Sequence, residues 1–142
     1  GPAMVDLPAL RDCEIAFLVI HGKQGEGGEL QALLDLAGIA YTPSELLGSA
    51  LAMDKDVSKR LFRSMAIPTA DWALWPALPE AIGSLGLPLV VKPSREGSTV
   101  GLTVVKSMND LEPAVATARR YDEQVLVERE AEVGGAEPRR GL

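Results

Sequence analysis

Two lysines are the residues of this 142-residue chain best placed to hold an anion. Lys92 ends the apolar run at residues 89–91, in which alternate side chains face opposite sides of a predicted strand, so its ammonium starts beside an apolar surface. Lys55 follows Asp54 at the first position of a predicted helix, where the helix dipole disfavours a cation and a bound anion would offset that cost. Both lysines also fit a simpler interpretation, in which their ammonium groups extend into solvent.

A segment rich in glycine and hydroxyl side chains follows Lys92 and joins two predicted strands. Residues 95–101 run Arg-Glu-Gly-Ser-Thr-Val-Gly. The glycines allow backbone N–H groups to converge on an anion, while Ser98 and Thr99 add hydroxyl donors. This composition is typical of a flap that covers phosphate groups, and it is also common in ordinary hairpin loops.

Glu128 closes the apolar run at residues 125–127 in the way that Lys92 closes its own run. The two residues could form a structural salt bridge with each other. In the alternative interpretation, Lys92 holds a phosphate while Glu128 accepts hydrogen bonds from an adenine amino group or a ribose.

His21 and Glu26 belong to a glycine-rich junction between a predicted strand and a predicted helix, at residues 21–28. The spacing of its glycines matches neither the dinucleotide-binding fingerprint nor the phosphate-binding P-loop. Glu26 is a candidate to hold a substrate ammonium or to cap the helix with its charge. A single histidine such as His21 is more often structural than catalytic.

Hydrophobic periodicity predicts the elements that must position these residues. The predicted strands span residues 15–20, 72–75, 87–92, 102–105 and 124–128. The predicted helices span residues 29–37, 44–51, 78–85 and 109–120. A further helix runs from its cap at Asp54 to a stop at Pro68. Asn109 and Glu112 form the predicted capping box of the last helix, which places Pro113 in its first turn.

The chain is therefore expected to have an α/β fold that becomes α+β in its second half. Residues 5–53 are expected to form an N-terminal α/β domain, which the family resemblance described below implies is incomplete, and residues 54–130 a small sheet with two helices. Residues 131–142 lose all periodicity and are expected to be a disordered tail.

The composition disfavours several classes of function and points to a cytoplasmic protein. The net charge of −6 and the isoelectric point near 4.8 argue against a general nucleic-acid or membrane-surface binder. Cys13 is the only cysteine, so no disulfide can form within the chain. A membrane-spanning helix needs about 20 apolar residues, and no apolar run in this sequence is that long. The predicted strand at 15–20 is expected to leave an apolar edge open to a second copy, which predicts either a homo-oligomer or a disordered N-terminal part.

Taken in order along residues 14–130, these features resemble one family closely, the D-alanine–D-alanine ligases of the ATP-grasp superfamily. Each motif alone is weak, and their order makes the resemblance specific. The four collinear motifs are His21-Gly22-x-x-Gly25-Glu26-x-Gly28-x-Leu30-Gln31, Gly38-Ile39-x-Tyr41-Thr42, Ser49-Ala50-Leu51-Ala52-Met53-Asp54-Lys55 and Lys92-Pro93-Ser94-Arg95-Glu96-Gly97-Ser98.

The resemblance implies an ATP-dependent ligation for peptidoglycan synthesis. In that reaction, ATP phosphorylates the carboxylate of one D-alanine, and the amine of a second D-alanine attacks the acyl phosphate. The resemblance further implies that Lys55 and Lys92 contact phosphates and that Glu128 is the carboxylate on the adenine side. Ser98 and Thr99 would form the flap over the γ-phosphate and D-alanine.

The resemblance also implies catalytic roles for three residues, with Ser98 in the flap, and with Glu26 and His21 either on the substrate side or supporting the residues that contact the substrate. Gly27 departs from the acidic or small polar residue that is usual in the family, and Thr99 stands where a second serine is common. Both departures are mild.

The family's remaining catalytic groups have no counterpart in this sequence. These are the glutamate that binds the first D-alanine, the substrate-loop tyrosine, the arginine that stabilises the oxyanion, and the acidic and asparagine ligands of Mg²⁺. Because phosphoryl transfer depends on metal and positioning for nearly all its acceleration, the chain is expected to be a fragment that is inactive alone. The alternative is a non-catalytic module that binds nucleotide or associates with itself.

Overall fold

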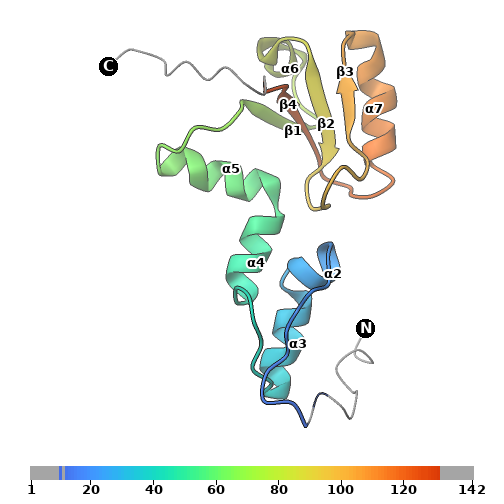
Figure 1. The fold of residues 1–142 in the computed structure, drawn as a ribbon. Coiled ribbons are helices and arrows are strands. Elements are labelled where there is room, and N and C mark those ends of the chain that lie inside the picture. Colours follow the sequence, from blue (N-terminus) through green and yellow to red (C-terminus); the bar gives the residue numbers. More distant parts are fainter. Residues whose placement is uncertain (1–9, 11, 132–142) are drawn as a thin grey trace.

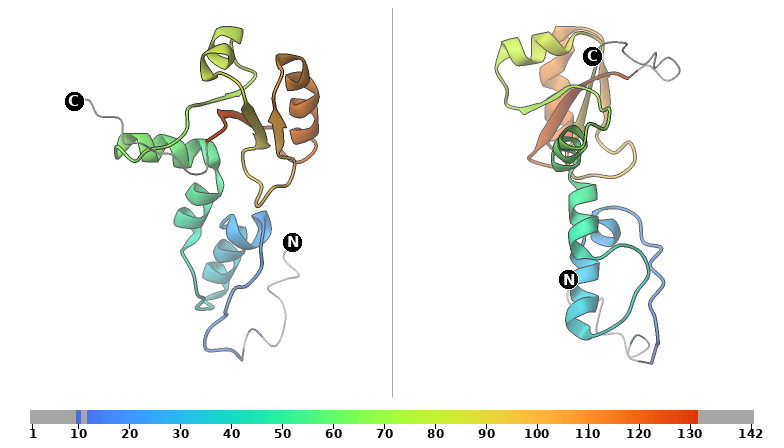
Figure 2. Two further views of the ribbon diagram at one scale, coloured as in Figure 1. Left: turned by 45° about the horizontal axis from the view of Figure 1, so that its top comes forward. Right: turned by 90° about the vertical axis from the view of Figure 1, so that its left-hand side faces the viewer.

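The computed structural model describes residue 10 and residues 12–131. Figure 1 shows two groups of elements, with a sheet and its helices at one end of the molecule and a group of helices without a sheet at the other. The N-terminal group contains α2 (Lys23–Glu26), α3 (Glu29–Ala37) and α4 (Leu46–Met53). The helix α5 (Lys55–Ser64) follows α4 directly and leads to the sheet (Figure 2).

The second group is built on a four-stranded sheet whose neighbouring strands are all antiparallel. In the spatial order β1-β4-β2-β3, its strands are β1 (Trp72–Trp75), β4 (Val125–Arg129), β2 (Leu89–Pro93) and β3 (Thr103–Val105). The register pairs Lys92 with Leu126 and Val90 with Glu128. Lys92 and Glu128 are therefore diagonal neighbours on one face of the two central strands.

Two helices cover the other face of this sheet, as expected. The helix α6 (Pro79–Leu85) contacts β1 and β4, and α7 (Leu111–Ala118) contacts β2 and β3. Leu89 and Val127 belong to the main core cluster beneath these helices and are fully buried. The alternate residues of the same strands, including Lys92, point to the opposite face, so the predicted alternation along β2 is confirmed.

The N-terminal group has a smaller core built on α3. Leu30 and Leu34 of this helix pack against Ala16, in a cluster separate from the core of the sheet. Gly38 ends α3 in a left-handed conformation, with φ of 67°. The predicted bounds of this helix and its predicted glycine cap are both confirmed.

The prediction of a buried strand at residues 15–20 is wrong. One parallel bridge joins Ala16 to Tyr41, and the segment is otherwise extended without a ladder. Ile15, Phe17 and Val19 are exposed to solvent, by 55, 74 and 66% respectively. A buried parallel strand needs neighbours along its edges and cover on both faces, and the described residues supply only one short edge contact.

The junction at residues 21–28 is also more regular than predicted, because its middle forms the short helix α2. Gly22 precedes this helix with φ of 85°, a conformation that the absence of a side chain permits. The helix α5 ends at Ser64, before the predicted stop at Pro68. The remaining predicted elements are confirmed, with bounds that shift by no more than two residues.

The predicted capping box before α7 is wrong. Ser107 accepts a hydrogen bond from the backbone N–H of Asn109 at 3.4 Å and begins a 3₁₀ turn at Met108–Asp110. The helix itself begins only at Leu111, so Asn109 is not its cap. Pro113 does lie in the first turn of α7, as predicted.

Of the predicted tail at residues 131–142, only residue 131 is described. In residue 10 and residues 12–131, no helix is both long and apolar enough to cross a membrane.

Candidate functional site

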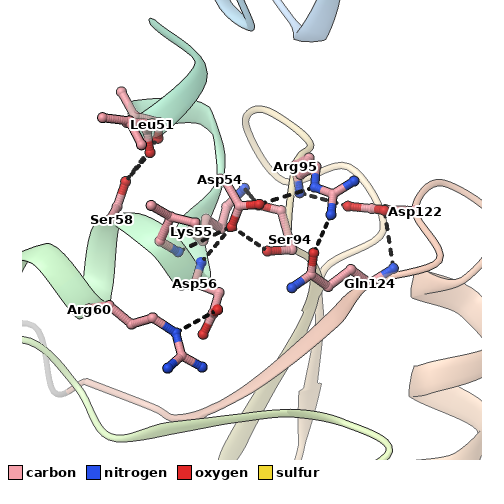
Figure 3. Close-up of polar contacts among 12 residues, drawn as sticks. Leu51, Asp54, Lys55, Asp56, Ser58, Arg60, Ser94, Arg95, Asp122 and Gln124 are labelled. Atoms are coloured by element: carbon pink, nitrogen blue, oxygen red, sulfur yellow. Dashed lines mark hydrogen bonds and ion pairs between the residues drawn. The ribbon is translucent and has the colours of Figure 1, made fainter. Parts of the chain in front are cut away.

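The carboxylate of Asp54 joins α5 to the loop after β2. Its Oδ1 accepts hydrogen bonds from the backbone N–H groups of Asp56 and Val57 at 3.1 and 3.2 Å, so Asp54 is the predicted N-cap. The same carboxylate accepts from the Ser94 hydroxyl at 3.3 Å and forms an ion pair with Arg95 Nε at 3.1 Å (Figure 3). One side chain therefore fixes both where the helix begins and where the loop leaves the sheet.

A second set of contacts holds the base of this loop to the turn before β4. The Ser94 N–H donates to the Gln124 carbonyl at 2.8 Å. The Arg95 N–H donates to Asp122 Oδ2 at 2.9 Å, and the Arg95 guanidinium donates to the Gln124 side chain (Figure 3). Since Ser94 is fully buried, the start of the 95–101 segment is fixed from two sides.

Lys55 lies against the same loop, so its interpretation as a solvated surface lysine is wrong. Its backbone N–H donates to the Ser94 carbonyl at 3.0 Å, and its ammonium donates to the carbonyls of Ser94, at 3.3 Å, and of Glu96. Burial lowers the pKa of the Lys55 ammonium, and the positive charge of Lys92 contributes to the lowering. The two predicted lysines are thus close enough to repel each other, and an anion between them would relieve the repulsion.

Glu128 lies between two lysines on the face of the sheet opposite α6 and α7. Its carboxylate accepts a hydrogen bond from the Lys92 ammonium and forms an ion pair with the Lys59 ammonium at 2.9 Å. The side chains of Glu128, Lys59 and Lys92 are 12, 10 and 20% exposed. The salt bridge between Lys92 and Glu128 is confirmed as a contact, and phosphate binding by Lys92 stays a prediction.

Lys59 is a residue of this cluster that was not predicted from the sequence. It follows Lys55 by four residues on α5, so the two side chains share one face of the helix. This spacing is the signal that could have found Lys59. Its partners come from later segments, because its ammonium donates to the Thr69 hydroxyl and the Ala70 carbonyl, both at 2.9 Å.

Trp72 of β1 holds α5 on this face of the sheet. The indole N–H donates to Asp56 Oδ1 at 2.7 Å, and the Arg63 guanidinium lies 4.2 Å from the centre of the ring. Asp56 is buried and also accepts a hydrogen bond from Arg60 at 2.8 Å. This docking brings Lys59 to the carboxylate at the end of β4.

The segment at residues 95–101 reaches from the sheet toward the N-terminal group. Ser98 and Thr99 are exposed, and Ser98 has φ of 53°, a left-handed conformation that costs a residue with a side chain about 1–2 kcal/mol. A Cβ added to Gly97 would lie 3.8 Å from Gly22 Cα and 3.9 Å from Glu26 Oε2. The structure therefore brings the predicted flap and the predicted substrate-side glutamate together.

Glu26 closes its own turn, while His21 lies at the surface. The Gly22 N–H donates to Glu26 Oε2 at 2.6 Å, ahead of the short helix α2, and no side chain caps the predicted helix α3 by a hydrogen bond. His21 Nδ1 lies 4.0 Å from Glu26 Oε1, and the His21 side chain is 94% exposed. A cavity of about 260 Å³ beside them is lined by Gln31, whose buried Oε1 has no hydrogen-bond partner among the described residues.

The candidate site is suited to an anion. It combines ammonium groups with hydroxyl and backbone donors, and the carboxylate of Glu128 lies between two lysines. Within residue 10 and residues 12–131, no three histidine, cysteine, aspartate or glutamate side chains are arranged to hold a metal ion. The described residues therefore do not fit a Mg²⁺ site of their own.

The family model described as D-ala D-ala ligase C-terminus matches residues 61–137, which is more than half of the chain. A D-alanine–D-alanine ligase of Paracidovorax citrulli (strain AAC00-1) is 45% identical over 133 residues, which are 90% of this chain and 40% of that relative. One of Ectopseudomonas mendocina (strain ymp) is 47% identical over 117 residues, which are 80% of this chain and 37% of that relative. The chain spans about 40% of the length of the curated relatives it matches.

Solved structures of the same kind of enzyme resemble this fold. A D-alanine–D-alanine ligase from Bacillus anthracis matches with a TM-score of 0.80 and 36% identity, over 86% of this chain and 41% of that one. A structure of the ligase from the same organism, complexed with ATP, matches with a TM-score of 0.81 and 32% identity, over 93% of this chain and 45% of that one. The expected fold, mixed in helices and strands with a small sheet, is thereby confirmed.

The junction at Asp54 generates a prediction for stability. Asp54→Ala should lower the free energy of unfolding by about 2–3 kcal/mol, because it removes a helix cap worth about 1 kcal/mol and the acceptor of Ser94 and Arg95. Asp54→Asn keeps an oxygen that can cap α5 and should cost about half as much or less. Urea denaturation would measure both variants, and equal losses would contradict the prediction, because they would show that a neutral oxygen cannot replace the charged carboxylate at this position.

Proposed function

Because this chain belongs to the D-alanine–D-alanine ligase family, we propose that it forms one wall of the ATP site used to ligate two D-alanines through an acyl phosphate. The product of this proposed reaction serves peptidoglycan synthesis. The observation that supports the proposal best is the packing of Lys55 against Ser94, which brings this cation to the loop that directly follows Lys92. Since the chain spans about 40% of the length of its relatives, the part proposed for its described residues is nucleotide binding.

The proposed site belongs to an ATP-grasp small subdomain at residues 54–130, preceded by an incomplete N-terminal domain at residues 5–53. The two separate core clusters support this division, since one lies beneath α6 and α7 and the other on α3. The proposed boundary falls at Asp54, between α4 and α5.

The nucleotide would be bound mainly through its phosphates. Lys55 and Lys92 would donate charge-assisted hydrogen bonds to phosphate oxygens, which are stronger than bonds between neutral groups. Ser98 and Thr99 would add hydroxyl donors from the segment that covers them, and Glu128 would lie on the adenine side. When bound, ATP supplies the phosphoryl group that activates a carboxylate. We place the ligands of the accompanying Mg²⁺ outside the described residues, because these hold no suitable cluster.

D-alanine is proposed to bind where the covering segment meets the N-terminal group. Ser98 comes from the segment, and Glu26 and His21 come from the junction that it approaches. The Glu26 side chain is 52% exposed and offers a carboxylate to a substrate ammonium. The buried Gln31 Oε1 would gain a partner from any N–H donor placed beside it.

Calorimetry with ATP and Mg²⁺ tests the nucleotide site. The chain is expected to bind, and Lys92→Ala is expected to weaken binding by about tenfold to a hundredfold, because a hydrogen bond to a charged group contributes about 1.5–3 kcal/mol. The matched control is Lys106→Ala, which changes an exposed lysine after β3. The absence of heat at millimolar nucleotide, or equal weakening by both variants, would contradict the proposal.

We also propose that the chain associates with itself through residues 15–20. Within the described residues, this segment has edge contacts only to residues 40–42, where Ala16 exchanges backbone hydrogen bonds at 2.8 and 3.0 Å. The apolar side chains on its other face are exposed, with Phe17 at 74%. An extended apolar segment with a free edge is a template for pairing with another chain.

Sedimentation of the chain at several concentrations tests this association. The wild-type chain is expected to form a dimer or larger species, and Phe17→Asp is expected to shift the population toward monomer, because a charge is costly in an apolar interface. Leu36→Asp is the matched control, since Leu36 is 87% exposed on α3 and lies outside the segment. A monomeric wild-type chain, or the same shift in both variants, would rule out pairing through residues 15–20.

A further inference from the structure

The two lysines that share Glu128 are held to different degrees. The Lys59 ammonium lies 2.9 Å from Glu128 Oε2. It also donates to the Thr69 hydroxyl and the Ala70 carbonyl, both at 2.9 Å, and lies 5.2 Å from the centre of the Trp72 ring. An ammonium has three N–H donors, so each donor of Lys59 has an acceptor. Lys59 is therefore a fixed cation.

Lys92 is held much less firmly. In the part of the chain that the structure describes, its ammonium has one hydrogen-bond partner, Oε1 of the same carboxylate. It thus has donors to spare for another acceptor. Its side chain is 20% exposed, against 10% for Lys59, and it lies close enough to Lys55 for the two positive charges to repel. Lys92 is the cation of this cluster that an incoming anion would attract.

Lys92 could not leave Glu128 easily if that carboxylate had no second partner. The Glu128 side chain is 12% exposed, and a carboxylate that is removed from water without a counter-charge is strongly disfavoured. Because Lys59 binds the other oxygen, Glu128 keeps one counter-charge whatever Lys92 does.

We propose that Lys59 is a positioning residue of the nucleotide site, which holds and neutralises Glu128 while Lys92 turns from that carboxylate to a phosphate. The inference rests on the proposed function, since it takes a nucleotide phosphate as the second partner of Lys92. Lys59 itself stays with Glu128, Thr69 and Ala70 and does not touch the nucleotide phosphates.

A double-mutant cycle in the 142-residue chain tests this role. Lys59→Met is expected to weaken ATP binding by about tenfold when Glu128 is present, because Lys92 then becomes the only counter-charge of that carboxylate. In a Glu128→Gln background, the same change should alter ATP affinity by about twofold or less, because no carboxylate remains to be neutralised. Lys106→Met, the same change at an exposed lysine, serves as the control.

The comparison separates positioning from a structural effect. Both chains with Lys59→Met lack the bonds to Thr69 and Ala70, so a general loss of folding would weaken ATP binding in both backgrounds alike. Equal weakening in the two backgrounds would overturn the proposal, because Lys59 would then act through the fold or as a distant positive charge. An unchanged affinity in the Lys59→Met chain would also overturn it.

A measurement without nucleotide distinguishes a failure of this inference from a failure of the proposed function. If the wild-type chain binds no ATP, the proposed function is wrong, and labelling of Lys92 by an amine-reactive acetylating reagent still tests the cluster. Mass spectrometry should show Lys92 labelled several-fold more slowly in Lys59→Met than in wild type, because Glu128 then binds Lys92 alone. Equal labelling rates would show that Lys59 does not compete for Glu128.

Discussion

The carboxylate of Asp54 is the interaction on which the arrangement of this chain depends. It caps α5 through two backbone N–H groups, and it holds the loop after β2 through Ser94 and Arg95. Lys55 lies on α5 and Lys92 on β2, and the two cations lie near each other because one acidic side chain binds both elements. A helix and a sheet whose residues are distant in the sequence thereby form one surface.

That surface brings lysines of α5 and β2 close to one another. Lys59 and Lys92 bind the carboxylate of Glu128, and burial together with the positive charge of Lys92 lowers the pKa of Lys55, against the opposing effect of nearby acidic side chains. Burial and the repulsion by Lys92 disfavour the charged form of Lys55, and a bound phosphate would offset both effects. Because a ligand that binds only the folded state stabilises that state, nucleotide binding and stability should be linked in this chain.

Local patterns predicted the elements whose causes are local. The bounds of α3 and its cap at Gly38 follow from helical periodicity and one glycine, and the opposite faces of Lys92 and Val91 follow from the alternation of a strand. The segment at residues 15–20 was mispredicted because burial of a strand depends on neighbours, which composition cannot supply. The spacing of Lys55 and Lys59 along the chain is enough to predict that they share a helix face. The contact of Lys59 with Glu128 could not be predicted in this way, because it joins residues that are distant in the sequence.

Two-dimensional ¹⁵N NMR of the chain titrated with ATP is the most direct test of the central claim, that one wall of a phosphate site is assembled by the Asp54 junction. The account predicts that the backbone signals of Lys55, of residues 94–99 and of Glu128 shift together and saturate at the same nucleotide concentration. The signals of α6 and α7, on the opposite face of the sheet, should stay in place. Shifts confined to those two helices, or no shifts at millimolar ATP, would contradict it.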